Sequence, residues 1–283
     1  MIDLHCHMLP ADDHDHADPG LALEMARIAL DDGIRHSVCA PQPAPGHSPQ
    51  DASRTRSATK RFAAALDQAG LPLRVSPGAA LQLEPELLPG LRQGRLPTLA
   101  DSRYYLLELP STAAPGGFSK TIATSLAAGY VPVIAHPERL DWLNESHYHR
   151  LVQAARQGAW LMVTAGAVTG RFGATARGWA ERLLDDGLVH LLASDAHDSD
   201  RHPPLLSAGR DAAACWVGAD EADRLVRERP AAIIANLTPG QVTPPPALAS
   251  LHARHGRPTH RASGTGQATF WLGRLFGLPL ATR

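Results

Sequence analysis

The sequence is poor in cysteine and has almost no net charge. Its 283 residues include three cysteines, Cys6, Cys39 and Cys215, which are widely separated and odd in number. This argues against a disulfide framework and fits a reducing cytoplasm. With 27 basic and 28 acidic residues the formal net charge is −1, so no strong field draws the chain to DNA or to anionic lipid. We therefore expect a cytoplasmic protein with no nucleic-acid partner.

The sequence pattern also argues against a secretory signal peptide and a transmembrane helix. Histidines and a run of aspartates occupy the place where a signal peptide has its basic, apolar and small residues. No apolar stretch approaches the roughly 20 residues of a transmembrane helix. The cysteines argue against one enzyme class as well, because none begins the Cys-x5-Arg loop of a cysteine-dependent tyrosine phosphatase.

Short apolar runs alternate with helical patterns along the chain. The expected strands end near residue 7 and then cover 34–40, 71–83, 104–109, 131–136, 159–164 and 188–194. The expected helices are 20–30, begun by Asp18 and Pro19, then 58–69, 118–128, 151–157 and 179–186, with a final helical region to about 236. This alternation predicts a parallel sheet covered by helices, and 283 residues with 44% hydrophobic content suit a single α/β barrel.

We expect two parts, a barrel over residues 1–240 and a tail over 241–283. The tail contains three consecutive prolines, a His/Arg-rich segment at 252–261 and aromatic residues near its end. One interpretation is a partly disordered tail, and the other is a docking segment for a partner or a membrane surface. The polar stretch 41–57 also has two interpretations, a lid over the site or an ordinary surface loop.

Residues of the metal-ligand type follow several of the expected strands. Because side chains alternate along a strand, we expect His5 and His7 to face one side while Leu4 and Cys6 pack on the other. Two imidazoles directed at one point can chelate a divalent metal. Later apolar runs end in Glu108, His136, Asp195 and His197. Because chemistry in α/β barrels sits at the carboxyl ends of the strands, these residues predict one metal site.

Five segments, taken in order, resemble the bacterial manganese-dependent protein-tyrosine phosphatases of the polymerase-and-histidinol-phosphatase superfamily. They are MIDLHCHMLP at 1–10, LEL at 107–109, PVIAHPER at 132–139, TGRFG at 169–173 and ASDAH at 193–197, and the match extends to about Asn236. Members are encoded with capsular or exopolysaccharide export machinery. The resemblance implies a distorted (β/α)7 barrel that dephosphorylates the tyrosine-rich tail of a bacterial tyrosine kinase controlling polysaccharide chain length. It also implies a manganese cluster held by His5, His7, Glu108, His136, Asp195 and His197.

Two positions depart from the family pattern. Ala80 stands where the family usually has a glutamate that bridges two metals, and Gln42 stands where it has a histidine. An alanine methyl group cannot ligate a metal, so we expect fewer than three bound ions. On a regular strand Gln82 and Glu84 share the facing direction of Ala80, and either is a candidate substitute.

Hydrolysis of a phosphate monoester requires a metal-generated hydroxide and positive groups, because the anionic oxygens repel a nucleophile. Arg139 and Arg201 each follow a ligand-bearing strand and are the candidates for a phosphate clamp. A surface ion pair is the alternative for each of them. Arg171 lies in the Gly-rich turn, where we expect it to brace a loop.

Two other functions stay open at this point. One is a related phosphoesterase for a small molecule such as histidinol phosphate, or for nucleic acid, because fold and metal site do not choose the substrate. The other is a catalytically weakened protein that binds a phosphorylated or polysaccharide-assembly partner, which the departures at Ala80 and Gln42 support. Formation of a homo-oligomer is left open as well.

Overall fold

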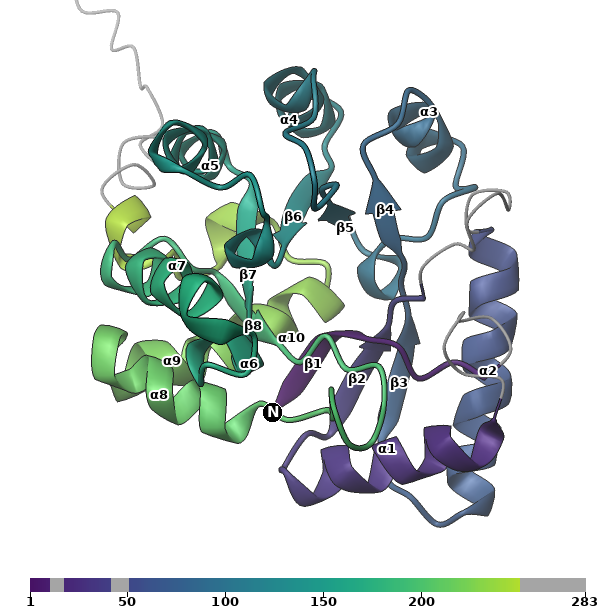
Figure 1. The fold of residues 1–283 in the computed structure, drawn as a ribbon. Coiled ribbons are helices and arrows are strands. Elements are labelled where there is room, and N and C mark those ends of the chain that lie inside the picture. Colours follow the sequence, from purple (N-terminus) through teal and green to yellow (C-terminus); the bar gives the residue numbers. More distant parts are fainter. Residues whose placement is uncertain (11–17, 42–50, 250–283) are drawn as a thin grey trace, which may run out of the picture.

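Parallel strands lie at the middle of the molecule and helices surround them (Figure 1). This computed structural model describes residues 1–10, 18–41 and 51–249. The strands are β1 (Ile2–Cys6), β2 (His36–Cys39), β3 (Arg74–Pro77), β4 (Ala80–Gln82), β5 (Tyr104–Glu108), β6 (Val131–Ala135), β7 (Trp160–Thr164) and β8 (Leu191–Ala193).

The helices follow the strands along the chain. The α-helices are α1 (Pro19–Asp31), α2 (Ala52–Gln68), α3 (Leu87–Arg92), α4 (Phe118–Ala127), α5 (Glu145–Gln157), α6 (Ala165–Val168), α7 (Gly173–Asp185), α8 (Ser207–Val217), α9 (Ala219–Val226) and α10 (Glu228–Ile234). Short 3-10 helices are η1 (Leu99–Asp101), η2 (Pro137–Arg139), η3 (Pro239–Gln241) and η4 (Pro246–Leu248). No helix in the described ranges has the length and apolar content needed to cross a membrane.

The strands form two parallel sheets, one in the order β1-β2-β3 and the other in the order β4-β5-β6-β7-β8. A single parallel bridge between Cys6 and Ala196 links the end of β1 to the segment after β8. The first and last strands therefore lie side by side although they are far apart in the sequence. The predicted α/β fold of parallel strands covered by helices is confirmed.

The single strand predicted over 71–83 is divided in two, so that detail of the prediction is wrong. β3 pairs with β2, whereas β4 pairs with β5, and the chain changes sheet at Gly78 and Ala79. A Cβ atom on Gly78 would lie 2.6 Å from Cγ1 of Val38. The chain can pass β2 this closely only because residue 78 has no side chain.

Helix α2 begins earlier than predicted and takes in the end of the polar stretch 41–57. Asp51 caps it, because its Oδ1 accepts hydrogen bonds from the backbone N–H groups of Ser53 (2.7 Å) and Arg54 (3.1 Å). Residues 42–50, which hold Gln42 and most of the proposed lid, lie outside the described residues. The predicted cap of α1 is confirmed, since Asp18 accepts from the N–H of Gly20 at 2.8 Å.

The apolar core has two layers that follow the alternation of side chains along the strands. An interior cluster contains Leu4, Val38, Ala80, Tyr104, Leu106, Val133, Ala135, Trp160, Met162, Leu191 and Ala193. An outer cluster contains the intervening residues, among them Tyr105, Leu107, Ile134, Leu161, Val163 and Leu192, packed with helix residues. A side chain that continues the inward alternation past a strand end is therefore placed above the interior cluster.

The described part of the expected tail, residues 241–249, packs on the strands and helices. Val242 joins the interior cluster and Leu248 joins the outer cluster. Arg229 is fully buried, pairs with Glu221 at 2.6 Å and donates through Nε to the carbonyl of Thr243 at 2.8 Å. The His/Arg-rich segment 252–261 and the aromatic residues after it lie outside the described residues.

Candidate metal and phosphate site

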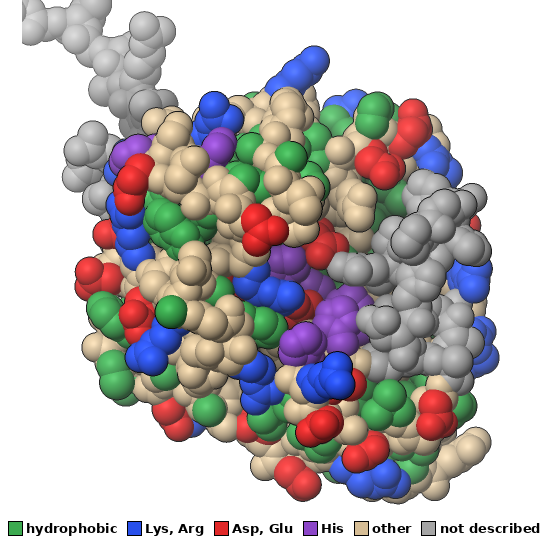
Figure 2. Space-filling view, viewed as in Figure 1, with side chains coloured by type: hydrophobic (Ala, Val, Ile, Leu, Met, Phe, Trp, Pro, Cys, Tyr) green, Lys and Arg blue, Asp and Glu red, His purple; other side chains and the backbone are tan. Residues whose placement is uncertain are grey.

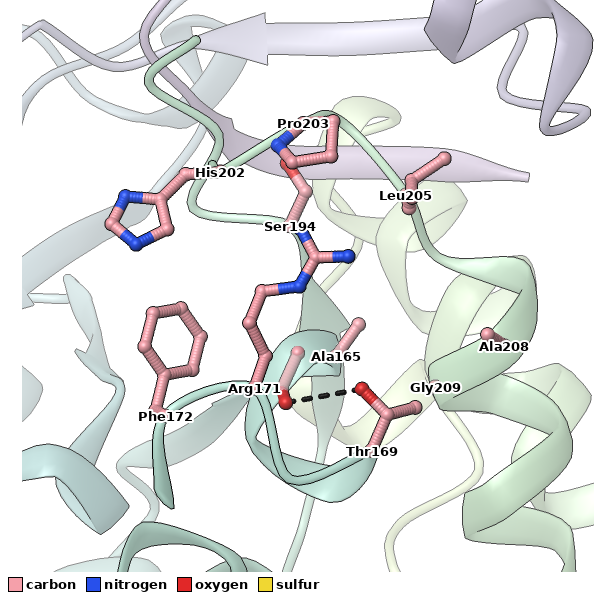
Figure 3. Close-up of a pocket in the computed structure, with 11 residues that line it drawn as sticks. Ala165, Thr169, Arg171, Phe172, Ser194, His202, Pro203, Leu205, Ala208 and Gly209 are labelled. Carbon is pink, nitrogen blue, oxygen red and sulfur yellow. Dashed lines mark hydrogen bonds between the residues drawn. The ribbon is translucent and has the colours of Figure 1, made fainter. Parts of the chain in front are cut away.

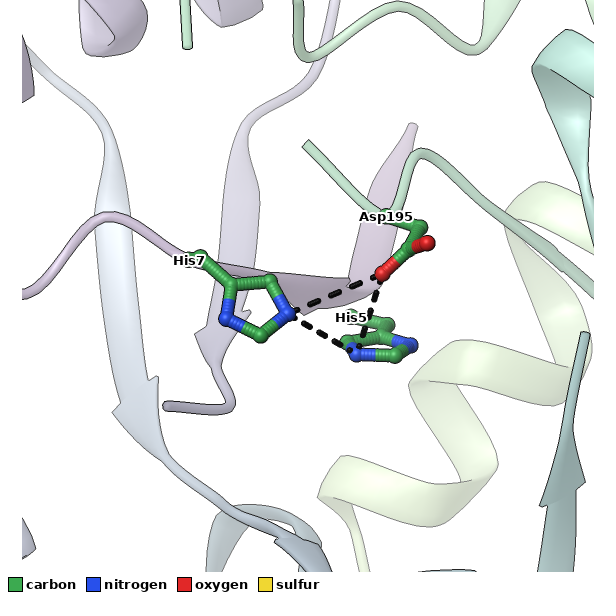
Figure 4. A group of neighbouring side chains, drawn as sticks. All are labelled: His5, His7 and Asp195. Atoms are coloured by element: carbon green, nitrogen blue, oxygen red, sulfur yellow. Dashed lines mark hydrogen bonds and ion pairs between the residues drawn. The ribbon is translucent and has the colours of Figure 1, made fainter. Parts of the chain in front are cut away.

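Three buried side chains, His5 and His7 at the end of β1 and Asp195 just after β8, converge on one point (Figure 4). The Nε2 atoms of His5 and His7 are 3.2 Å apart, and they lie 3.3 and 3.6 Å from Oδ1 of Asp195. Nε2 of His197 is 3.5 Å from the same oxygen, and the His197 ring stacks on His7 with centroids 3.9 Å apart. Three imidazole nitrogens thus surround one carboxylate oxygen.

This donor set fits a divalent transition metal. Metal–ligand distances of about 2.0–2.3 Å place the ligand atoms of one ion roughly 3–3.5 Å from each other, which is close to the separations found here. Among the described residues, His5, His7 and Asp195 have ligand atoms that all lie within 4.8 Å of one another. Imidazole and carboxylate together suit manganese, iron or zinc better than a cation that prefers oxygen ligands alone.

The remaining two predicted ligands form a pair next to this cluster. Nε2 of His136 lies 3.3 Å from Oε1 of Glu108, and the His136 ring stacks on His5 with centroids 5.8 Å apart. Glu108 continues the inward alternation of Tyr104 and Leu106 on β5. All six side chains predicted as metal ligands therefore come from the carboxyl ends of strands and lie in one place.

A bulge in β1 turns the two N-terminal histidines toward the site. Asp3 pairs with Ser37 and Cys6 pairs with Cys39, so two residues of β1 oppose one residue of β2. Leu4 accordingly lies in the interior cluster, and His5 faces the same way. The expectation that Leu4 and Cys6 share the opposite face is wrong for Leu4, because the extra residue interrupts the alternation.

Asp3 links β1 to the end of β8 through hydrogen bonds next to the candidate metal ligands. Its Oδ1 accepts hydrogen bonds from the backbone N–H groups of Ser194 (3.1 Å) and His5 (3.3 Å), and its Oδ2 accepts from the Ser194 hydroxyl. Burial raises the pKa of Asp3 to about 6, although the bonds from Ser194 oppose the rise. Two backbone bonds, from Asp195 N–H to the His5 carbonyl and from His7 N–H to the Ala196 carbonyl, complete the connection.

Two of the candidate ligands have left-handed backbone conformations. His136 has φ +33° and Asp195 has φ +52°, whereas most residues other than glycine avoid this region. Such conformations cost about 1–3 kcal/mol each and persist where the surroundings enforce them. At His136 the chain leaves β6 and enters η2 at Pro137, which re-aims the imidazole toward Glu108.

The pKa values of His5 and of the two carboxylates suit metal binding. Burial lowers the pKa of His5 to about 3, so its imidazole is neutral, which is the form that ligates a metal. Burial opposes ionisation of Asp195, yet contact with His5 and the other imidazoles holds its pKa well below the usual range. Burial likewise opposes ionisation of Glu108 and His136, but their mutual hydrogen bond prevails, lowering the pKa of the acid and raising that of the base.

A cavity of about 490 Å³ opens over this site and is lined by Gln82, Glu108, His136, Arg139, Asp195 and His197 among others. Figure 2 shows the histidines gathered at the middle of this face, with basic and acidic side chains beside them. Arg139 donates through Nη1 to Oδ2 of Asp195, the oxygen other than the one facing the histidines.

The second candidate for the phosphate clamp lies elsewhere. Arg201 is exposed and is not among the described residues that line the cavity. Its backbone is held from both sides, because its N–H donates to Asp198 and its carbonyl accepts from Nη1 of Arg171 at 3.2 Å. That bond supports the predicted bracing role of Arg171.

Ala80, Gln82 and Glu84, at or near the position where the family has a glutamate, lie in three different environments. Ala80 is fully buried in the interior cluster and pairs with Leu106, one inward position below Glu108. Gln82 pairs with Glu108 itself and lines the cavity. Glu84 is exposed and is absent from the described lining. A glutamate at position 80 would therefore rise from the apolar interior toward the candidate metal ligands.

Sequence reasoning gave no role to Glu138, although it lies between two predicted site residues. Its carboxylate is buried and accepts a hydrogen bond from the N–H of Thr164 at 2.9 Å, which ties η2 to the end of β7. Burial raises the pKa of Glu138. This hydrogen bond fixes the turn that carries His136 and Arg139. In the sequence, the only sign of such a role was the position of Glu138 within the PVIAHPER segment.

Fold and site together define an α/β protein with a histidine and carboxylate centre at the carboxyl ends of its parallel strands. A family model described as "Capsular polysaccharide synthesis, CpsB/CapC" matches residues 1–235. The chain belongs to the CpsB/CapC family, which confirms the resemblance seen in the five segments.

Named relatives and solved structures agree with this assignment. The chain is 34% identical over 198 residues to the tyrosine-protein phosphatase YwqE of Bacillus subtilis, covering 70% of this chain and 78% of that protein. It is 31% identical over 167 residues to the tyrosine-protein phosphatase CpsB of Streptococcus pneumoniae, covering 57% and 68%.

A crystal structure from work on YwqE and CpsB, described as metal-dependent tyrosine phosphatases, matches with a TM-score of 0.78 at 29% identity, covering 84% of this chain and 96% of that one. A β-aspartyl dipeptidase from Fervidobacterium islandicum, with a TM-score of 0.51 and 13% identity over 82% of this chain and 72% of that one, shares the fold alone.

Proposed function

We propose that this chain is a manganese-dependent phosphatase that removes phosphate from tyrosines in the tail of a bacterial tyrosine kinase controlling capsular or exopolysaccharide synthesis. The observation that carries the proposal is the convergence of His5, His7, Asp195 and His197 on one point beneath an open cavity. Its family relatives are named tyrosine-protein phosphatases, which supports the choice of phosphotyrosine among phosphate esters.

Each part of the site has a task in this reaction. His5, His7, Asp195 and His197 would hold one ion, and Glu108 with His136 would contribute to a neighbouring position. A divalent metal held there supplies Lewis acidity and a nucleophile at neutral pH. Arg139 lies on the cavity wall with its remaining N–H groups available to the equatorial phosphate oxygens, where charge must be stabilised.

The number of ions follows from the surviving ligands. Six ligand-type side chains are assembled, and Ala80 provides no donor atom where the family has a carboxylate. We infer that the purified protein binds manganese at fewer than three ions per chain. Gln42 lies outside the described residues, so the proposal rests on Ala80 alone.

The test combines metal analysis with turnover of a phosphotyrosine peptide. The protein would be stripped with a chelator, reloaded with manganese and assayed by elemental analysis and phosphate release. We expect turnover that requires added metal, together with one or two bound ions per chain. A loaded protein that releases no phosphate from the peptide would contradict the proposed activity, and three fully occupied ions would contradict the proposed stoichiometry.

A second candidate is a weakened member of the family that binds a phosphorylated partner without turning it over. Its specific support is Ala80, a buried methyl group at the position where a bridging ligand is expected. Under that alternative the loaded protein would bind the phosphopeptide in calorimetry and release no phosphate. A small-molecule phosphate ester such as histidinol phosphate, tested in parallel, would identify a phosphoesterase of different substrate class.

A further inference from the structure

The guanidinium of Arg139 has a second partner besides Asp195. Its Cζ atom lies over the face of the Phe172 ring, 4.2 Å from the ring centroid. A cation over a ring is attracted by the negative charge on the face of the π system. Arg139 is thus held by a carboxylate at one edge and by an aromatic face on one side.

Phe172 is itself fixed by its surroundings. Figure 3 shows its ring beside His202, and the two ring centroids are 5.3 Å apart. On another side stands Gly166 of α6, where an added Cβ would lie 2.9 Å from Cε2 of Phe172. The partly buried ring therefore lies between Arg139 of η2, His202 and Gly166, and a group added at Gly166 would push against it.

We propose that Phe172 is a positioning residue that orients the Arg139 guanidinium for phosphate. The proposal rests on the proposed function, in which Arg139 contacts the substrate phosphate. An aromatic face neither donates to nor accepts from N–H groups that lie in the guanidinium plane, so it fixes the plane and leaves those donors free. A long arginine side chain without such a surface samples many rotamers and holds a phosphate less tightly.

The first test replaces the aromatic face. Phe172→Leu keeps an apolar side chain and removes the ring, so the inhibition constant of inorganic phosphate should rise about tenfold and kcat/KM for a phosphotyrosine peptide should fall by a similar factor. Manganese content should not change, because no metal ligand is altered. Phe172→Tyr restores an aromatic face and should recover most of the loss.

The second test displaces the ring and leaves residue 172 unaltered. Gly166→Ala places a methyl group against Phe172, and the same change at Gly178 of α7 meets no atom within 4 Å. We expect Gly166→Ala to weaken phosphate inhibition as Phe172→Leu does, whereas Gly178→Ala should behave as the unaltered protein. This pair separates a displaced ring from a general effect of alanine in a helix.

A double-mutant cycle decides whether Phe172 acts through Arg139. In an Arg139→Gln background, Phe172→Leu should cause no further loss of phosphate affinity. Equal losses in both backgrounds, or unchanged phosphate inhibition in both Phe172→Leu and Gly166→Ala, would overturn the proposal. If the unaltered protein does not hydrolyse phosphotyrosine, the proposed function fails separately, and calorimetric binding of inorganic phosphate to the manganese-loaded variants still tests the positioning role.

Discussion

Asp195 contacts Arg139 with one carboxylate oxygen and faces three histidines with the other. The same side chain therefore joins the candidate metal position to the candidate phosphate position. A change at Asp195 should disturb both, whereas a change at His5 should disturb the metal position first. Substitutions at Asp195 and at His5 should therefore be compared in the same experiment.

We predict that Asp195→Ala and His5→Ala each reduce phosphatase activity to background and lower the manganese content, while both variants stay folded. Each removes a donor atom at a strand end and leaves the two apolar clusters intact. Elemental analysis, peptide turnover and circular dichroism are the measurements. His149→Ala, an exposed histidine on α5, is the matched control. Undiminished turnover in either ligand variant would remove these residues from the site.

Ala80→Glu should raise manganese content and turnover together. The new carboxylate would start from a fully buried position inside the strands, where an ionised group is costly unless a cation neutralises it. The variant without metal should therefore be less stable than the parent, and manganese should raise its melting temperature by more. If neither metal content nor turnover increases, Ala80 is not the position of a lost bridging ligand.

The neighbouring residue supplies the control for this experiment. Ala79 is equally buried but belongs to the outer cluster, facing the helices. Ala79→Glu introduces the same charge one residue away and should lower stability with no gain of metal. A rise in metal content in both variants would indicate a nonspecific effect of added negative charge.

Removing the buried Arg229 charge should cost far more stability than removing an exposed one. Arg229→Gln leaves Glu221 with only the partly exposed Arg224 as an ion-pair partner and weakens the bond to the Thr243 carbonyl, so we expect a loss of about 3 kcal/mol. Arg95→Gln breaks an exposed pair with Glu86 and should change the unfolding free energy by about 1 kcal/mol or less. Denaturant unfolding of both variants measures the difference, and similar losses would contradict it.

His36 should make the protein less stable in mild acid. Burial, with help from Arg74, lowers the pKa of His36 in the folded chain. The unfolded chain then binds the proton more readily, so stability is complete above the unfolded pKa of about 6.5 and declines as the pH falls through it. His36→Asn should lose less unfolding free energy between about pH 7.5 and pH 5.5 than the parent does. Parallel curves for the two proteins would exclude this contribution.

Much of the site could be predicted because its residues stand at strand ends that the sequence marks clearly. Apolar runs before Glu108, His136 and Asp195 define buried parallel strands, and carboxyl ends of such strands share one side of the fold. Residues that are far apart in the sequence but stand at such strand ends are therefore predicted to be neighbours in the fold. Pro137 gave a further local signal, since it ends β6 directly after its ligand.

The features of the fold and the site that were not predicted depend on contacts between segments that are distant in sequence. The division of the strand at Gly78 reflects how closely Val38 of β2 approaches it, and no local pattern reports that approach. The role of Phe172 depends on Arg139, which comes from a different loop, so a Gly-rich turn with an aromatic residue gave no indication of it. The buried pair of Arg229 and Glu221 lies where the sequence predicted only a helical region, and no local pattern reports the pairing.

The bulge in β1 makes the spacing of residues at the N-terminus as important as their identity. One extra residue between Asp3 and Cys6 brings His5 to the metal side although Leu4 before it also points inward. On a regular strand of the same sequence with Leu4 facing inward, both imidazoles would point toward the helices. An alignment that places a gap inside this stretch would therefore misassign the candidate ligands.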